Sequence, residues 1–150
     1  MTELNASGRP LKRFKGLMEF LGAKLTAWGP DYAAIQIQVA DCHRNGINVV
    51  HGGVMAALID TAGAHAGIFC PEPAETRNAM TISLNVNLVG NIPEGTLIAE
   101  GRVRKAGKTI FVSSCDVHDE NGNLLATGEV VGRYGPDSSA TNSITARPEN

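Results

Sequence analysis

A long apolar stretch in the middle of the chain constrains the fold more than any other feature. From Gly52 to Phe69 most residues are Ala, Gly, Val, Met, Leu or Ile, and only Asp60 and His65 are ionisable. The apolar residues follow no single stripe, which indicates a helix that is covered on most sides. The rest of the 150-residue chain must therefore wrap around this helix, and that length suffices for one domain with its own core.

Segments on both sides of this helix carry the apolar and polar alternation of strands. Turns rich in Gly, Pro and Asn separate them, which favours antiparallel neighbours. In the segment after the helix, Met80, Ile82 and Leu84 form the expected buried face and alternate with Thr81 and Ser83. The expected elements are a short helix over 11–21, strands over 24–28 and 32–39, the central helix over 51–69, and strands over 79–89, 96–104, 109–117 and 124–133. This order predicts an α+β fold in which an antiparallel sheet of about six strands wraps around the central helix.

The ends of the chain and its charge narrow the class of protein. Residues 1–10 are polar and are expected to be flexible, while residues 135–150 have the composition of a disordered tail, so the domain spans 11–134. The 13 basic and 15 acidic residues give a net charge of −2, which provides no general attraction for nucleic acid or an anionic membrane. We expect neither partner.

Cysteine and histidine spacing bears on location and metal binding. Cys42, Cys70 and Cys115 contain no CxxC pair, and the four histidines are scattered, so we expect neither a disulfide framework nor a metal site. The N-terminus lacks an apolar signal core, and Asp60 and His65 interrupt the longest apolar run. A cytoplasmic protein without a metal or other cofactor is the expectation.

A carboxylate inside an apolar helix needs either a partner or a function. Asp60 could be structural, since many buried acids cap backbone donors or pair with Lys or Arg. No Lys or Arg lies between Arg44 and Arg77, however, so no neighbour along the helix neutralises this charge. The structural and the functional interpretation both remain open, and the missing cation favours the second.

The start of the helix carries a second candidate group. His51, Gly52 and Gly53 stand where backbone N–H groups and the positive end of the helix dipole face an approaching ligand. Glycine permits close approach, and such a helix end stabilises a developing oxyanion. The pattern suits acyl-transfer chemistry at a carbonyl, although a histidine at this position can also simply bond to a loop.

Helical geometry suggests that the two ends act in different copies of the chain. Asp60 follows His51 by nine positions, which corresponds to about 13 Å of rise and opposite faces of a helix at about 100° per residue. A sheet wrapped around one helix also leaves an edge strand to be covered. We therefore expect at least a homodimer, in which Asp60 of one chain meets the His51 and Gly52 end of the other.

These residues also resemble a known family. The run Asn45–Gly53 followed by Asp60, Thr61 and Ala62 is similar to the hotdog-fold acyl-CoA thioesterases of the phenylacetic-acid-degradation (PaaI) type, and the likeness covers 11–134. The resemblance implies a hotdog fold, hydrolysis of acyl-CoA to a free acid and coenzyme A, and a homotetramer.

The resemblance also implies roles for individual residues. Asp60 would be the nucleophile or the general base, and the Gly52 N–H would bind the oxyanion. His51 would position the thioester or hold the loop, Asn45 would orient the thioester or water, and the Thr81 hydroxyl would assist Asp60. Relatives can carry Ser at this last position; Thr keeps the hydroxyl and adds a methyl group.

A coenzyme A site near the dimer interface is a further implication. Charged side chains and turn N–H groups suit its phosphates, and a solvated strand edge that discourages aggregation is the competing interpretation of the same charges. The candidate substrate-binding residues are Gly53, Arg102, Arg104, Lys105, Gly107 and Lys108.

Two other functions share this pattern of residues. A non-catalytic module that binds acyl-CoA would need the fold but not Asp60, and a hydratase would need the histidine and the acid in the reverse order. No Lys or Arg on the central helix could recognise a charged acyl group, so we expect an aromatic or medium-chain acyl group.

Overall fold

The computed structural model describes residues 4–72 and 77–136. Its elements in chain order are α1 (Leu17–Phe20), β1 (Lys24–Gly29), β2 (Tyr32–Gln38), the 3-10 turn η1 (Asp41–His43), α2 (Gly52–Ile68), β3 (Ala79–Leu88), β4 (Thr96–Ala106), β5 (Ile110–Asp119) and β6 (Leu124–Tyr134). None of the helices in these two segments is long and apolar enough to cross a membrane.

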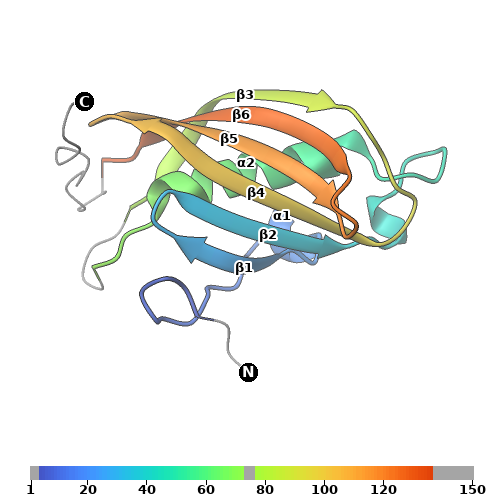
Figure 1. Ribbon diagram of the computed structural model, residues 1–150, viewed down its shortest axis with the longest axis horizontal. Coiled ribbons are helices and arrows are strands. Elements are labelled where there is room, and N and C mark those ends of the chain that lie inside the picture. Colours follow the sequence, from blue (N-terminus) through green and yellow to red (C-terminus); the bar gives the residue numbers. More distant parts are fainter. Residues whose placement is uncertain (1–3, 73–76, 137–150) are drawn as a thin grey trace.

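The described strands form one antiparallel sheet that curves around α2 (Figure 1). Its six strands lie in the order β1-β2-β4-β5-β6-β3 within residues 4–72 and 77–136. The predicted α+β architecture is thereby confirmed. The order leaves β1 and β3 at the two edges, and β3 pairs only with β6.

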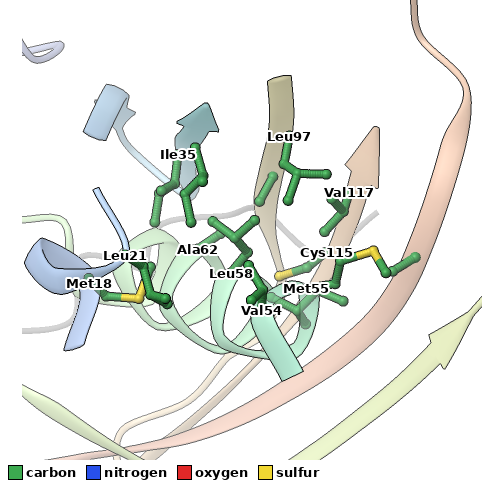
Figure 2. Packing of buried hydrophobic residues seen from close by; sticks show 14 of the residues in the cluster. Met18, Leu21, Ile35, Val54, Met55, Leu58, Ala62, Leu97, Cys115 and Val117 are labelled. Atoms are coloured by element: carbon green, nitrogen blue, oxygen red, sulfur yellow. The ribbon is translucent and has the colours of Figure 1, made fainter. Parts of the chain in front are cut away.

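The core lies between α2 and the inner face of the sheet (Figure 2). Met55, Leu58, Ile59 and Ala62 of α2 are fully buried. The helix lies directly on β4, because a Cβ atom at Gly101 would collide with the backbone carbonyl of Ala62. A helix covered in this way explains why its sequence shows no apolar stripe.

The first predicted helix is wrong in length. Only Leu17–Phe20 is helical instead of 11–21, because Gly16 adopts φ 63°, which a right-handed helix does not contain. Met18 and Leu21 of this segment are nevertheless buried in the core, whereas Leu17 is 63% exposed.

The N-terminal segment forms a closed loop where the sequence predicts a flexible end. The Asn5 side-chain oxygen accepts hydrogen bonds from the backbone N–H groups of Ser7 and Arg9, each at 3.0 Å. The Ala6 N–H donates to the Trp28 carbonyl oxygen of β1 at 2.8 Å, which fastens the loop to the sheet edge. The predicted tail, 135–150, lies outside the described residues beyond Pro136.

Edge strand β3 is where burial differs most from the prediction. Met80 is 73% exposed and Leu84 is 42% exposed, although the alternation places both on a buried face. A β-bulge between Thr81 and Ser83 shifts the register with β6 and changes which residues face α2. In a single chain, Met80, Ile82 and Leu84 of β3 are therefore exposed.

Candidate active site

Asp60 lies in the third turn of α2, and Thr81 of β3 holds its carboxylate. The Thr81 hydroxyl donates to Asp60 Oδ1 at 2.6 Å, and both side chains are half-buried. Asp60 Oδ2 accepts no hydrogen bond from any described residue. The carboxylate is thus fixed through one oxygen and retains a lone pair on the other for a proton or an electrophile.

The β3 bulge brings Thr81 to this position. Strict alternation would place Thr81 on the same side as Asn85 and Asn87, away from the core. In the structure Thr81 faces α2 on one side of the bulge, and Val86 and Leu88 face α2 on the other side. Because of the extra residue in the bulge, a polar side chain faces α2 at the start of the strand and apolar side chains face α2 at its end.

His51 is the N-cap of α2 and uses its side chain to begin the helix. Nδ1 accepts the Gly53 N–H at 2.8 Å, so that nitrogen is unprotonated and the neutral ring carries its proton on Nε2. The ring is exposed. The arrangement satisfies one of the free N–H groups of the helix start and leaves an Nε2–H donor that faces solvent.

The Gly52 N–H is the candidate oxyanion donor. It has no hydrogen-bond acceptor within the described part of the chain. A Cβ atom here would meet the end of the Leu88 side chain of β3, so glycine lets strand and helix approach without displacing Leu88. The unpaired donor therefore lies beside β3, as Asp60 does.

The prediction of opposite faces concerns His51 and Asp60, whereas the candidate oxyanion donor is the residue after His51. The helix begins at Gly52. Asp60 follows Gly52 by eight positions, which is about 80° around the axis and about 12 Å along it. The two groups are on the same side of the helix, and distance along the axis separates them.

The same distance limits what one chain can do. A reacting carbonyl must lie about 3 Å from both the attacking group and the oxyanion donor. A separation of about 12 Å along the helix axis excludes that for Asp60 and Gly52 of a single copy. If both act on one thioester, a second copy must supply one of them.

Asn45 organises the loop that precedes α2. Its side-chain oxygen accepts the N–H groups of Ile47 at 3.0 Å and Val49 at 3.3 Å. Its amide nitrogen has no partner among residues 4–72 and 77–136. The oxygen therefore serves the loop, and only the amide Nδ2 remains available to a substrate.

The basic cluster predicted to bind coenzyme A lies on the hairpin between β4 and β5, at the end of the molecule where α2 finishes (Figure 1). Arg102 is already engaged: its guanidinium lies 4.4 Å from the centre of the Tyr32 ring and 3.4 Å from Glu100. The Gly107 N–H donates to the Ile110 carbonyl oxygen within the turn. Exposed side chains that remain for phosphate binding belong to Arg104, Lys105 and Lys108.

The environment of Cys115 argues against a cysteine nucleophile near Asp60. Burial, followed by the negative charges of Asp116 and Asp60, raises the pKa of the Cys115 thiol to about 12. A thiol of that pKa is not a nucleophile at neutral pH. The described residues also include no group of three His, Cys, Asp or Glu side chains placed to bind a metal ion.

Sequence reasoning missed Leu88 and the N-terminal basic residues. The Leu88 side chain covers Gly52 at the helix start, a contact that no sequence pattern indicates. Arg9 and Lys12 line a pocket next to Trp28, although the first of them falls in a segment predicted to be flexible. The cations between Arg9 and Lys15 could have indicated an anion site, because they are as dense in the sequence as those between Arg102 and Lys108.

Comparisons with known proteins identify the family of this chain. The thioesterase superfamily model matches residues 47–126, which include the helix start and Asp60. A putative esterase of Halobacterium salinarum is 35% identical over 68% of this chain and 69% of its own length. Human acyl-coenzyme A thioesterase 13 is 29% identical over 69% of this chain and 74% of its own length.

A solved structure gives the same fold. The E. coli PaaI protein from the phenylacetic acid degradation operon superposes with a TM-score of 0.71 at 21% identity, over 81% of this chain and 85% of that one. At this identity the likeness supports the fold alone, and it is the predicted hotdog fold. With the family match and the relatives above, it follows that this chain belongs to the thioesterase superfamily and is a thioester hydrolase of the hotdog fold.

Proposed function

We propose that the substrate is an acyl-CoA with an aromatic or medium-chain acyl group and that Asp60 carries the reaction. The observation behind this assignment is the hydrogen bond of 2.6 Å from Thr81 to Asp60, which orients a carboxylate in a largely apolar region and leaves Oδ2 open. The human relative is named an acyl-coenzyme A thioesterase, which supports the coenzyme A thioester as the substrate class.

Two routes use the same atoms. As general base, Asp60 Oδ2 takes a proton from water while the resulting hydroxide attacks the thioester carbonyl. As nucleophile, Oδ2 attacks the carbonyl itself, and water then hydrolyses the mixed anhydride. In both routes the oxyanion is stabilised by the Gly52 N–H, and the coenzyme A thiolate leaves and takes up a proton.

The other candidate residues position the substrate. The His51 Nε2–H faces solvent beside the helix start and can donate to the thioester oxygen or to the loop of a neighbouring chain. Asn45 can donate through its amide nitrogen to the same region, and Gly53 keeps the His51 ring in place. Arg104, Lys105 and Lys108 are assigned to the phosphates of coenzyme A.

The proposal requires a homodimer. Strand β3 exposes a largely apolar edge, with Met80 and Ile82 at 73% and 54% exposure, and both halves of the site lie beside that strand. A second copy at this edge would cover the apolar side chains and bring its own helix start to the first chain's Asp60. We retain a homotetramer and a cytoplasmic location as further parts of the proposal.

The proposed preference for an uncharged acyl group rests on the absence of Lys and Arg from α2. The helix has no Lys or Arg that could pair with a second carboxylate on the acyl group. The solved PaaI structure comes from a phenylacetic acid degradation operon, which supports including aromatic acyl groups in the proposal.

The decisive experiment measures thiol release from a panel of acyl-CoA substrates with native protein and with Asp60→Asn. Loss of the base or nucleophile is expected to lower kcat/KM by at least about a thousandfold. Asp116→Asn is the matched control, because Asp116 is an exposed carboxylate on β5. Full activity of Asp60→Asn would refute the assignment, and acyl-CoA binding without turnover by native protein would favour the non-catalytic module.

A second experiment tests the shared site. Asp60→Asn and Gly52→Pro chains are each expected to be inactive, since the second lacks the N–H and has a bulky ring beside Leu88. Mixing the two under conditions of subunit exchange should restore part of the activity, because some sites would combine the intact halves. Absence of rescue after exchange has been demonstrated by mass spectrometry would contradict a shared site.

A further inference from the structure

A pocket lies at the C-terminal end of α2, away from Asp60. Its volume is about 300 Å³, and it is lined in part by Arg9, Lys12, Trp28, Ile68 and Arg77. Ile68 follows Asp60 by eight positions, which places it about 12 Å further along the helix axis. The pocket belongs to the N-terminal segment and β1, and none of its lining residues has a role in thioester hydrolysis.

Arg9 is held in place before any ligand binds. The loop around Asn5 fixes its backbone, because the Arg9 N–H donates to Asn5 Oδ1 at 3.0 Å and the Arg9 carbonyl accepts the Asn5 N–H at 2.7 Å. Its Nη2 donates to the Cys70 carbonyl oxygen at 2.6 Å. Its Nε has no hydrogen-bond partner among residues 4–72 and 77–136. The guanidinium therefore keeps donor capacity that the described part of the chain does not use.

The charge of the pocket is one-sided. Three cationic side chains line it, and none of the described residues that line it is Asp or Glu. Within residues 4–72 and 77–136, neither Arg9 nor Lys12 forms a salt bridge. The Lys12 charge also affects His65. Burial is the main reason that the pKa of His65 is lowered, and a hydrogen bond to the Thr61 backbone raises that pKa. The positive charge of Lys12 lowers it. An anion would meet the charges of Arg9 and Lys12 here.

The wall of the pocket is apolar. Trp28 already satisfies its indole N–H by donating to the His65 carbonyl oxygen at 2.7 Å, and its ring packs edge-on against Phe69 at 5.5 Å. The ring is therefore fixed and offers carbon surface next to the cations, as does Ile68. A volume of about 300 Å³ is at the lower end for ligand sites, which suits one small molecule.

We propose that this pocket binds a small organic anion, in which a carboxylate or a phosphate monoester contacts Arg9 and Lys12 and an aromatic or short aliphatic body lies against Trp28. The Arg9 guanidinium and the Lys12 ammonium donate to the anionic oxygens. This site is independent of thioester hydrolysis, and an occupant would brace the N-terminal loop against the end of α2.

Trp28 makes the proposal directly testable, because it is the single tryptophan in the chain. Phenyl phosphate, benzoate and inorganic phosphate are titrated separately against the native protein at low ionic strength, with tryptophan emission and calorimetry as readouts. Phenyl phosphate or benzoate is expected to give a saturable change. Lys12→Ala should weaken that binding on the order of tenfold, the effect of losing one charged hydrogen bond.

Arg13→Ala is the matched control, since Arg13 is an exposed cation of the same segment that does not line the pocket. It should bind within about twofold of the native protein. Arg9→Lys removes the guanidinium and keeps the positive charge. Its thermal midpoint, measured in parallel, shows whether a change in binding comes from the guanidinium or from a destabilised N-terminal loop. Tighter binding of phenyl phosphate identifies a phosphate monoester as the ligand, and tighter binding of benzoate identifies a carboxylate.

Three results would overturn the proposal. The first is no saturable change with either organic anion. The second is an equal loss of affinity in Lys12→Ala and Arg13→Ala, which would show attraction by general surface charge. The third is inorganic phosphate binding as tightly as phenyl phosphate, which would show that Trp28 and Ile68 recognise nothing. Thioester hydrolysis can persist or fail in each case without affecting the conclusion.

Discussion

Replacing Thr81 with valine tests whether a single hydroxyl prepares Asp60 for catalysis. Valine keeps the branched shape that suits strand β3 and removes only the donor that bonds to Asp60 Oδ1 at 2.6 Å. Asp60 is half-buried, so water can replace the lost donor, and the free energy of unfolding should change by less than about 1 kcal/mol.

The effect on activity should be larger than the effect on stability. A hydrogen bond to a charged group contributes about 1.5–3 kcal/mol, and losing that orientation in the transition state corresponds to a fall of about 10- to 100-fold in kcat. Thr81→Ser restores the hydroxyl without the methyl group and should retain kcat within about threefold. Native kcat in Thr81→Val, measured by thiol release from a saturating acyl-CoA, would refute the view that Thr81 orients the carboxylate.

Three further changes test other parts of the structure. Gly101→Ala should lower the free energy of unfolding by about 1–3 kcal/mol in a urea titration, because its Cβ atom collides with the Ala62 carbonyl; an unchanged midpoint would contradict the close contact of α2 with β4. Met80→Lys should leave the fold intact, since Met80 is 73% exposed, yet shift sedimentation from dimer to monomer and reduce activity with it; an unaltered oligomer would exclude this edge as the interface. Cys42, which is exposed, should react with a thiol reagent within minutes at pH 8, while Cys115, with its pKa raised to about 12 by burial, should react only after unfolding; fast labelling of both would disprove the burial of Cys115.

Local sequence patterns predicted the elements well where the periodicity was long. The continuous apolar composition of α2 and the alternation in β4 to β6 were sufficient to predict a helix surrounded by an antiparallel sheet, and the structure has that arrangement. The helix expected over 11–21 failed because one residue, Gly16 at φ 63°, ends the helical path while the apolar spacing continues. Spacing records which residues are buried, and it does not record the backbone angle between them.

The sequence proposes the residues of the candidate site, and the structure adds their positions. His51, Gly52 and Asp60 were chosen from their residue types and positions, and the rotation was counted from His51 although the proposed oxyanion donor is Gly52. Thr81 was singled out through family resemblance, while alternation alone assigned it to the opposite face of β3. A bulge of one residue reverses that assignment, because side chains in a strand alternate with a period of two.

The sequence by itself determined the buried helix, the strands around it, the glycine-rich helix start and an acidic residue without a cation nearby, because each of these depends on residues that are close in the chain. Only the tertiary structure decided that Thr81 bonds to Asp60, that Leu88 covers Gly52, and that Arg9 reaches the end of α2. These contacts join segments that are distant in the sequence, so they depend on the register of the sheet and on loop closure, which local periodicity does not specify.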